Sequence, residues 1–212
     1  MNYAQLVNLI TYYCESTESS FVSNIPTFVQ LAEERIYNSV QIPAIRKNST
    51  ATMTIGNKYM SLPSDWLSTF SLAVFNPANN EYTYLLHKDV NYIRQAYPDA
   101  DDTGLPQYYA IWDADTMILG PAPDIAYTAE LHYYYYPTSI VDAGTSWLGN
   151  NFETVLLYGS LREAYTYLKG EQDMMNYYEQ KYQESLMLLK RLGDGLDRQD
   201  AYRSGQARIP VT

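Results

Sequence analysis

Cysteine and histidine are nearly missing from this sequence: Cys14, His87 and His132 are the only residues of the two types. One cysteine cannot form a disulfide within the chain, and one cysteine with two distant histidines cannot supply the ligands of a structural zinc site. We expect Cys14 to be a small buried apolar residue, because it lies on the apolar side of a predicted helix. We predict no bound metal and no cofactor.

Long apolar runs are missing as well. No segment approaches the roughly eighteen consecutive apolar residues of a membrane-spanning helix. The first residues, Met1 to Gln5, hold no basic segment followed by an apolar one, so we expect no signal peptide of the Sec type. The sequence therefore predicts a soluble protein with no membrane partner.

Basic residues are scarce: 14 Lys and Arg stand against 24 Asp and Glu, a net charge of −10. Tight, wrapping contact with nucleic acid is excluded, because it needs many cations to neutralise phosphates. The charge is uneven. Beyond residue 189, five basic and three acidic residues give +2, which leaves −12 on the rest of the chain. An acidic body with a basic end predicts different partners for the two.

Motifs of catalysis are also absent. Asp102-Thr103-Gly104 matches the triplet of aspartic proteases, but it follows a turn-forming segment instead of an apolar strand. Asp99 and Asp101, with Asp102, lack the glycine spacing and closing glutamate of a calcium loop. Asp113 and Asp115 suit the tip of a hairpin better than a glycosidase pair. We predict no catalytic residue and no enzyme activity.

Tyrosine, in contrast, is abundant, at 23 of 212 residues. Its ring gives a large, fairly rigid contact area, and its hydroxyl tolerates water, which is why tyrosine is enriched at protein interfaces. Many of these side chains are expected in the core. The set as a whole favours a protein that packs against partners.

Helical periodicity appears at both ends of the chain. A helix is predicted over 3–14, and a second one from about Asn24, with Pro26 in its first turn, to Pro43. A third helix is predicted from about residue 151 with Asn150 as its cap, and Gly193 is predicted to end the fourth.

The middle of the chain has the alternation of strands. Two short runs around Gly56-Asn57 predict a hairpin, and 107–119 predicts a second one. Further strands are expected at 72–75 and 82–86, and a short helix capped by Asp89. The longest strand, 127–136, has one apolar face and one face, with His132, Tyr134 and Tyr136, that is both polar and aromatic.

This order predicts an α+β chain: a four-helix bundle with an inserted antiparallel β domain and an extended C-terminal tail. The predicted parts are 1–48 and 148–192 for the bundle, 49–147 for the β domain, and 193–212 for the tail.

Segments along nearly the whole chain are similar, in the same order, to the head-to-tail adaptor (connector) proteins of tailed bacteriophages, especially short-tailed ones. They are Phe21–Pro26, Ala32–Ile36, Leu62–Trp66, Gly104–Pro106, Gly120–Pro123, Leu156–Leu168 and Asp200–Gly205. The resemblance implies a ring, typically twelvefold, beneath the portal protein. Such a ring extends the DNA channel and docks the tail tube or nozzle, and fibres in some phages.

From this resemblance we expect a virion protein of the head-tail junction, assembled in the host cytoplasm, through which genomic DNA passes without sequence-specific binding. The tail, with Arg198, Tyr202, Arg203 and Arg208, is predicted to bind the portal. His132, Tyr134 and Tyr136 are predicted at a subunit or tail interface, and Glu33, Glu34 and Asp173 along the channel. The alternative is an aromatic-rich carbohydrate-binding or receptor-binding module of the virion.

Overall fold

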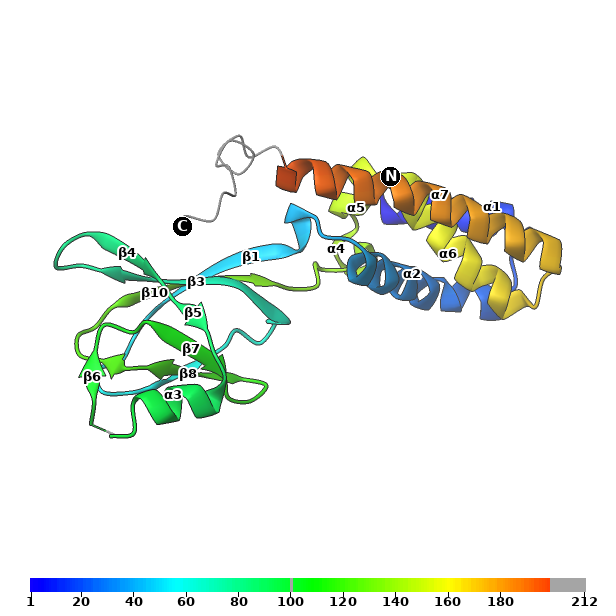
Figure 1. Ribbon diagram of the computed structural model, residues 1–212. Coiled ribbons are helices and arrows are strands. Elements are labelled where there is room, and N and C mark those ends of the chain that lie inside the picture. Colours follow the sequence, from blue (N-terminus) through cyan, green and yellow to red (C-terminus); the bar gives the residue numbers. More distant parts are fainter. Residues whose placement is uncertain (100, 199–212) are drawn as a thin grey trace. The chain divides into compact units, whose positions relative to one another are not determined.

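A computed structural model describes residues 1–99 and 101–198, with side chains up to Gly193. Helices and strands are both present, so the predicted α+β class is confirmed. The chain divides into two compact units. The helical unit holds Met1–Ile45 and the residues from Tyr136 onward, and the β unit holds Arg46–Tyr135 (Figure 1).

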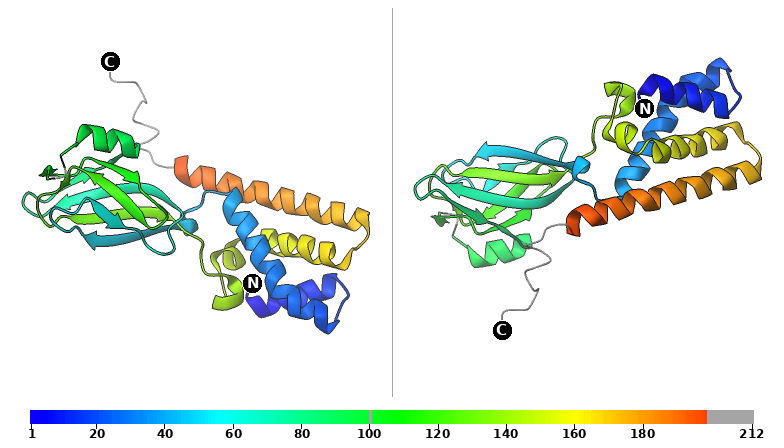
Figure 2. Two further views of the ribbon diagram at one scale, coloured as in Figure 1. Left: turned by 90° about the horizontal axis from the view of Figure 1, so that it is seen from below. Right: turned by 90° about the horizontal axis from the view of Figure 1, so that it is seen from above.

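The helical unit is built from two long helices before the β unit and two after it. These are α1 (Tyr3–Tyr13), α2 (Ser19–Ser39), α6 (Glu153–Leu168) and α7 (Gln172–Arg198). Shorter segments accompany them: the 3-10 turn Pro43–Ile45, α4 (Ile140–Ala143) and α5 (Trp147–Asn151). α6 and α7 lie side by side, and α2 packs against α6 (Figure 2). In the part of the chain that is described, no helix combines the length and apolar character needed to cross a membrane.

The start of α2 differs from the prediction. The helix begins at Ser19, not near Asn24, so Pro26 lies inside it. Burial explains the longer helix, because Phe21 in the added turn is fully buried, as is Ile25 one turn later. The predicted Asn150 cap of α6 is also wrong: Asn150 belongs to α5, and the α6 N-cap residue Phe152 makes no side-chain cap.

The end of α7 is a second correction. Gly193 was expected to terminate the helix, yet α7 continues to Arg198. The glycine serves packing instead: a Cβ at this position would lie 2.5 Å from the carbonyl oxygen of Gln41. Only a residue without a side chain lets the helix backbone approach that segment so closely.

The β unit contains two four-stranded sheets, one ordered β1-β10-β3-β4 and the other β2-β8-β7-β5, and a small pair β6-β9. The strands are β1 (Arg46–Thr52), β2 (Tyr59–Ser61), β3 (Ser68–Asn76), β4 (Glu81–Tyr84), β5 (Leu86–His87), β6 (Thr103–Gly104), β7 (Tyr108–Ile111), β8 (Thr116–Gly120), β9 (Ala122–Pro123) and β10 (Thr128–Tyr134). The hairpin predicted at 107–119 is present as β7-β8.

The hairpin predicted around Gly56-Asn57 is wrong. β1 pairs with β10 and β2 pairs with β8, so the two runs enter different sheets. Gly56 still makes a turn, with a φ of +71° that favours glycine.

Apolar residues from both sheets form one core, among them Leu72, Val74, Met117, Leu119 and Leu131. The helix α3 (Val90–Ala96), capped by Asp89 as predicted, packs on the other side of the second sheet over Ala110 and Ile118. The first sheet therefore has one face in the core. Its opposite face is the surface that the sequence singled out.

Candidate functional site

The outer face of the β1-β10-β3-β4 sheet follows from its strand register. Thr128, Glu130 and His132 of β10 alternate with the buried Ala129, Leu131 and Tyr133. Pairing places Asn48, Thr50 and Thr52 of β1, Ser71, Ala73 and Phe75 of β3, and Tyr82 and Tyr84 of β4 on the same face. The predicted division of this strand into an apolar and a polar-aromatic face is confirmed.

One end of this outer face carries Arg46, Phe70 and Tyr134. The Arg46 guanidinium carbon lies 4.4 Å from the centre of the Phe70 ring and 5.7 Å from that of Tyr134. The two rings meet edge to face with centroids 5.9 Å apart. Such cation–π and edge-to-face contacts hold half-exposed rings in place. Tyr134 is therefore a fixed, partly exposed side chain.

The other end carries aromatic residues of β3 and β4. Phe75 and Tyr82 are cross-strand partners whose ring centroids are 5.0 Å apart. Tyr82 is 58% and Tyr84 69% exposed, unusually high for large aromatic side chains. Sequence analysis did not select these two tyrosines, although their i, i+2 spacing in a strand was the signal that could have found them.

The prediction that Tyr136 lies on the polar-aromatic face of this strand is wrong. β10 ends at Tyr134, so Tyr136 is not on the strand or its outer face. It belongs to the helical unit, where its hydroxyl donates to Oδ1 of Asn38 at 2.6 Å. The alternation of apolar and polar-aromatic residues continues in the sequence past Tyr134, which is the last residue of β10 that pairs with another strand.

The inward side of β10 is anchored by Tyr133. Its hydroxyl donates to Oδ1 of Asp65 at 2.8 Å, and Nζ of Lys47 donates to Oδ2 at 2.7 Å. The hydrogen bond from Lys47 and then that from Tyr133 lower the pKa of Asp65. The indole N–H of Trp66 donates a further hydrogen bond to the hydroxyl oxygen of Thr69. The Leu62–Trp66 segment therefore stabilises the β unit.

Glu33, expected along the channel, is buried in the helical unit and 3% exposed. Its carboxylate accepts the backbone N–H of Ile140 at 3.0 Å, which ties α2 to the first turn of α4. Burial raises the pKa of Glu33, against hydrogen bonds from Ser139 and Ile140 that lower it. A side chain engaged in this way is not available to line a channel.

We expect Glu33→Ala to lower the free energy of unfolding by about 1–3 kcal/mol, because the buried N–H of Ile140 loses its acceptor. Glu33→Gln keeps an acceptor and should lose less. The raised pKa means that the folded state binds a proton more tightly than the unfolded state. The free energy of unfolding of the wild-type protein should therefore fall relative to that of the Glu33→Gln variant as pH rises from the ordinary glutamate pKa toward the raised pKa of folded Glu33.

Urea unfolding of the three proteins across acid to neutral pH measures both effects. Equal stability of the Ala and Gln variants would show that the Ile140 contact contributes nothing.

The other predicted residues are dispersed. Glu34 on α2 and Asp173 in the first turn of α7 are exposed. Arg198 is the last described residue of α7, and Tyr202, Arg203 and Arg208 lie outside the described residues. Among the described residues, His132 and Tyr134 share the outer face of the sheet, and Glu33, Glu34 and Tyr136 line one small hollow of about 200 Å³ in the helical unit.

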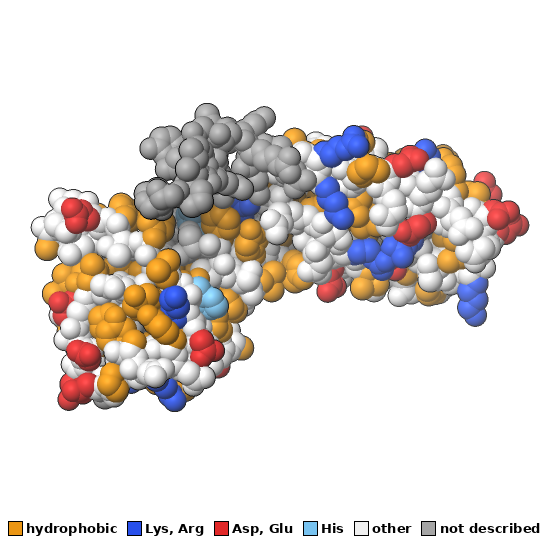
Figure 3. All heavy atoms as spheres, viewed as in Figure 1, with side chains coloured by type: hydrophobic (Ala, Val, Ile, Leu, Met, Phe, Trp, Pro, Cys, Tyr) orange, Lys and Arg blue, Asp and Glu red, His pale blue; other side chains and the backbone are white. Residues whose placement is uncertain are grey.

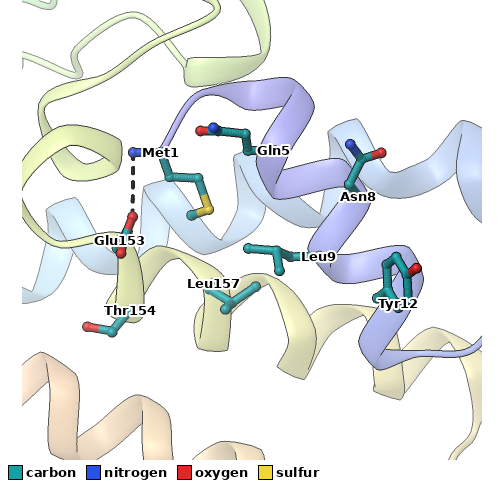
Figure 4. A pocket seen from close by; sticks show the side chains of 8 residues that line it. All are labelled: Met1, Gln5, Asn8, Leu9, Tyr12, Glu153, Thr154 and Leu157. Atoms are coloured by element: carbon teal, nitrogen blue, oxygen red, sulfur yellow. Dashed lines mark ion pairs between the residues drawn. The ribbon is translucent and has the colours of Figure 1, made fainter.

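The helical unit has an open apolar groove of about 490 Å³ between α1 and α6 (Figure 4). Leu9 and Tyr12 line it from α1 and Leu157 from α6, and Tyr12 is 82% exposed. Beside it the amino group of Met1 lies 3.5 Å from Oε2 of Glu153, the dashed line in Figure 4. Apolar atoms provide most of the exposed lining, with Gln5, Asn8 and Thr154 among the polar residues, so the groove has the chemistry of a protein contact.

Among the described side chains, no three His, Cys, Asp or Glu residues cluster as metal ligands. Burial raises the pKa of Cys14 to about 12, so its thiol stays protonated at neutral pH.

A family model described as SU10 adaptor protein matches residues 1–210. The match includes both units and residues of the C-terminal segment. No curated protein matches the chain.

Proposed function

The chain belongs to the SU10 adaptor protein family, and from this premise we propose that it forms a ring, typically twelvefold, beneath the phage portal. The ring extends the DNA channel and docks the tail tube or nozzle, with fibres as a further partner. The family itself is one of structural phage proteins, consistent with a head-to-tail adaptor and a place in the virion. The observation that supports this proposal most directly is the match of the family model over residues 1–210.

The division into two units supports this role. In our proposal α1, α2, α6 and α7 act as a four-helix bundle that meets the portal, with the β unit inserted between α2 and the later helices. An adaptor needs two surfaces, one for the head and one for the tail, and each unit has its own buried core. The finished ring requires head-to-tail contacts between copies that close on themselves.

The channel wall is proposed to be acidic. Phosphates are repelled by carboxylates, so DNA slides past such a wall without strong stationary contacts. Of the predicted residues, the exposed Glu34 and Asp173 remain suited to this place, whereas Glu33 is withdrawn because it is buried. DNA passage involves no sequence-specific binding.

The outer face of the β unit is proposed to contact a neighbouring subunit or a tail component, through His132, Tyr134, Tyr82 and Tyr84. Exposed aromatic side chains are frequent energetic centres of protein interfaces. We expect Tyr82→Ser with Tyr84→Ser to change the free energy of unfolding by less than about 1 kcal/mol, since both side chains are exposed.

The same double variant should reduce assembly on the portal at least tenfold, measured by co-sedimentation with portal rings. Thr50→Ala with Thr52→Ala on the polar part of the face is the matched control and should assemble normally. A loss of folding stability large enough to account for the loss of assembly would instead assign Tyr82 and Tyr84 a role in folding.

Electron microscopy of the chain mixed with its cognate portal tests the function as a whole. A ring stacked on the portal is expected. Absence of any complex at concentrations that saturate related head-tail contacts would overturn the proposal.

One observation favours an alternative, a carbohydrate-binding or receptor-binding module. The β unit has its own core and exposes Tyr82 and Tyr84 side by side on one sheet face, as a sugar-stacking platform requires. Binding of the purified chain to a glycan array, lost in the Tyr82→Ser, Tyr84→Ser variant, would support this alternative.

A further inference from the structure

A second surface of the β unit, around α3, joins cations to aromatic rings, and we name it the cation-aromatic surface. It comprises Lys58, Tyr59, Lys88, Tyr92, Arg94 and Trp112. The Arg94 guanidinium carbon lies 4.4 Å from the centre of the Trp112 ring, Nζ of Lys88 lies 5.1 Å from that of Tyr92, and Nζ of Lys58 lies 5.8 Å from that of Tyr59. Tyr59 and Trp112 also meet edge to face at 5.6 Å.

These three cations have no carboxylate partner among the described residues. Lys47 of the same unit, in contrast, is paired with Asp65 at 2.7 Å. The rings beneath the cations are partly exposed: Trp112 by 38% and Tyr92 by 42%. Trp, Tyr and Arg are the residues that most often dominate binding energy at protein interfaces.

A hollow of about 410 Å³ adjoins this surface, lined by His87, Lys88, Asp89, Val90, Ala110 and Ile111. It lies where the parallel strands β5 and β7 end. The Asp89 carboxylate already accepts the backbone N–H of Asn91. The hollow thus offers the apolar side chains of Val90, Ala110 and Ile111 to a side chain from outside, with Lys88 and Asp89 among its polar lining. Figure 3 shows hydrophobic side chains over β5, β7 and α3 with basic ones beside them.

The complementary surface is on the helical unit itself. The α1–α2 turn carries Glu15 and Glu18, and the α6–α7 turn carries Glu171; all three are exposed. The two turns lie at one end of the unit, because the Tyr165 hydroxyl donates to the carbonyl of Tyr13 and Phe21 packs near Tyr167.

Aromatic side chains surround these carboxylates. Tyr12 is 82%, Tyr13 43%, Tyr167 44% and Tyr177 46% exposed. Lys169 is the exposed cation between α6 and α7, so this acidic end keeps an excess of negative charge. Figure 3 shows acidic side chains at the end where α7 begins.

We propose that the cation-aromatic surface of one copy binds the acidic end of the helical unit in a second copy. Copies of net charge −10 repel one another in general, and the unpaired cations Lys58, Lys88 and Arg94 provide positive charge that an acidic partner can meet. The two surfaces differ, so the contact is head-to-tail, the type that closes into rings. In naming an interface within the ring, this inference rests on the proposed function.

Charge exchange tests the contact in the full chain. We expect Lys58→Glu with Arg94→Glu, and separately Glu15→Lys with Glu171→Lys, to weaken self-association at least tenfold in analytical ultracentrifugation at low salt. An equimolar mixture of the two variants should recover association, because each supplies the surface the other lacks. Lys190→Glu with Arg191→Glu makes the same charge change elsewhere and should associate as wild type.

Circular dichroism confirms that each variant is folded. A wild-type chain that stays monomeric at all concentrations, or a mixture that associates no better than its components, overturns the proposal. Tight binding of a fluorescent DNA duplex would also overturn the proposal, if it is as salt-sensitive as self-association and is lost in the Lys58→Glu, Arg94→Glu variant. The surface would then bind DNA. Normal rings of that variant on the portal would refute this contact while leaving the adaptor function intact.

Discussion

Removal of residues 199–212 will abolish binding to the portal and leave both units folded. The end of the chain beyond residue 189 is basic while the rest is acidic, so it is the segment best suited to a different partner. Among the residues whose side chains are described, the buried apolar ones of the helical unit run from Leu6 to Leu189, well before the cut. We therefore expect the free energy of unfolding to change by less than about 0.5 kcal/mol.

The place of the cut follows from α7. Because the helix continues to Arg198, a chain ended at 193 would lose part of it, and a chain ended at 198 would not. Binding is measured by co-sedimentation of the chain with purified portal rings. A full-length variant with Arg203→Glu and Arg208→Glu should weaken binding in the same direction, which separates charge from length. Unchanged binding by the shortened chain would refute portal docking through this segment.

Replacement of Gly159 by leucine will destabilise the helical unit by about 1–3 kcal/mol or more, because it overfills a closely packed site. Gly159 on α6 faces residues of both α2 and α7: a Cβ there would be 3.2 Å from Cβ of Ala32 and 3.3 Å from Cε2 of Tyr182. Tyr182 is 1% exposed, so its ring has little room to move away. The branched leucine side chain extends well beyond that Cβ.

Thermal unfolding followed by far-ultraviolet circular dichroism measures this loss. Thr166→Leu provides the control, since Thr166 is exposed on the same helix. Trp147 lies in the helical unit, so the readout for the β unit is made in a Trp147→Phe background. Fluorescence of Trp66 and Trp112, both in the β unit, should then report an unchanged transition there. A variant as stable as wild type would show that α2 or α7 can shift to make room.

Much of the local structure could be predicted because it depends on neighbours in the sequence. The alternation around Leu131 identified a strand with one buried face, and Asp89 identified the start of α3. The 107–119 hairpin was likewise predictable, since Asp113 and Asp115 suit a tight turn. These features depend on side-chain period and turn chemistry alone.

The errors have a common cause. Gly56-Asn57 has the composition of a hairpin turn, but the partners of β1 and β2 are β10 and β8, which lie far along the chain. Pro26 was expected in a first turn, yet burial of Phe21 extends the helix before it. Strand pairing and helix length were decided here by distant residues that no local pattern contains.

The candidate surfaces divide in the same way. His132 and Tyr134 were found from alternation, whereas the exposed Tyr82 and Tyr84 joined them only through pairing of β4 with β3. Glu33 has the sequence context of a surface residue and is buried against α4. The contact depends on Ile140, which is 107 residues away.

The sequence by itself determined the α+β class, the excess of tyrosine and of acidic residues, and the resemblance to adaptors. These depend on composition and on short-range order. Tertiary structure alone decided which tyrosines are exposed, why Gly193 is a glycine, and where unpaired cations meet aromatic rings. Those properties arise when segments far apart in the chain come together, and burial, close approach and charge pairing are then settled by the neighbour each residue meets.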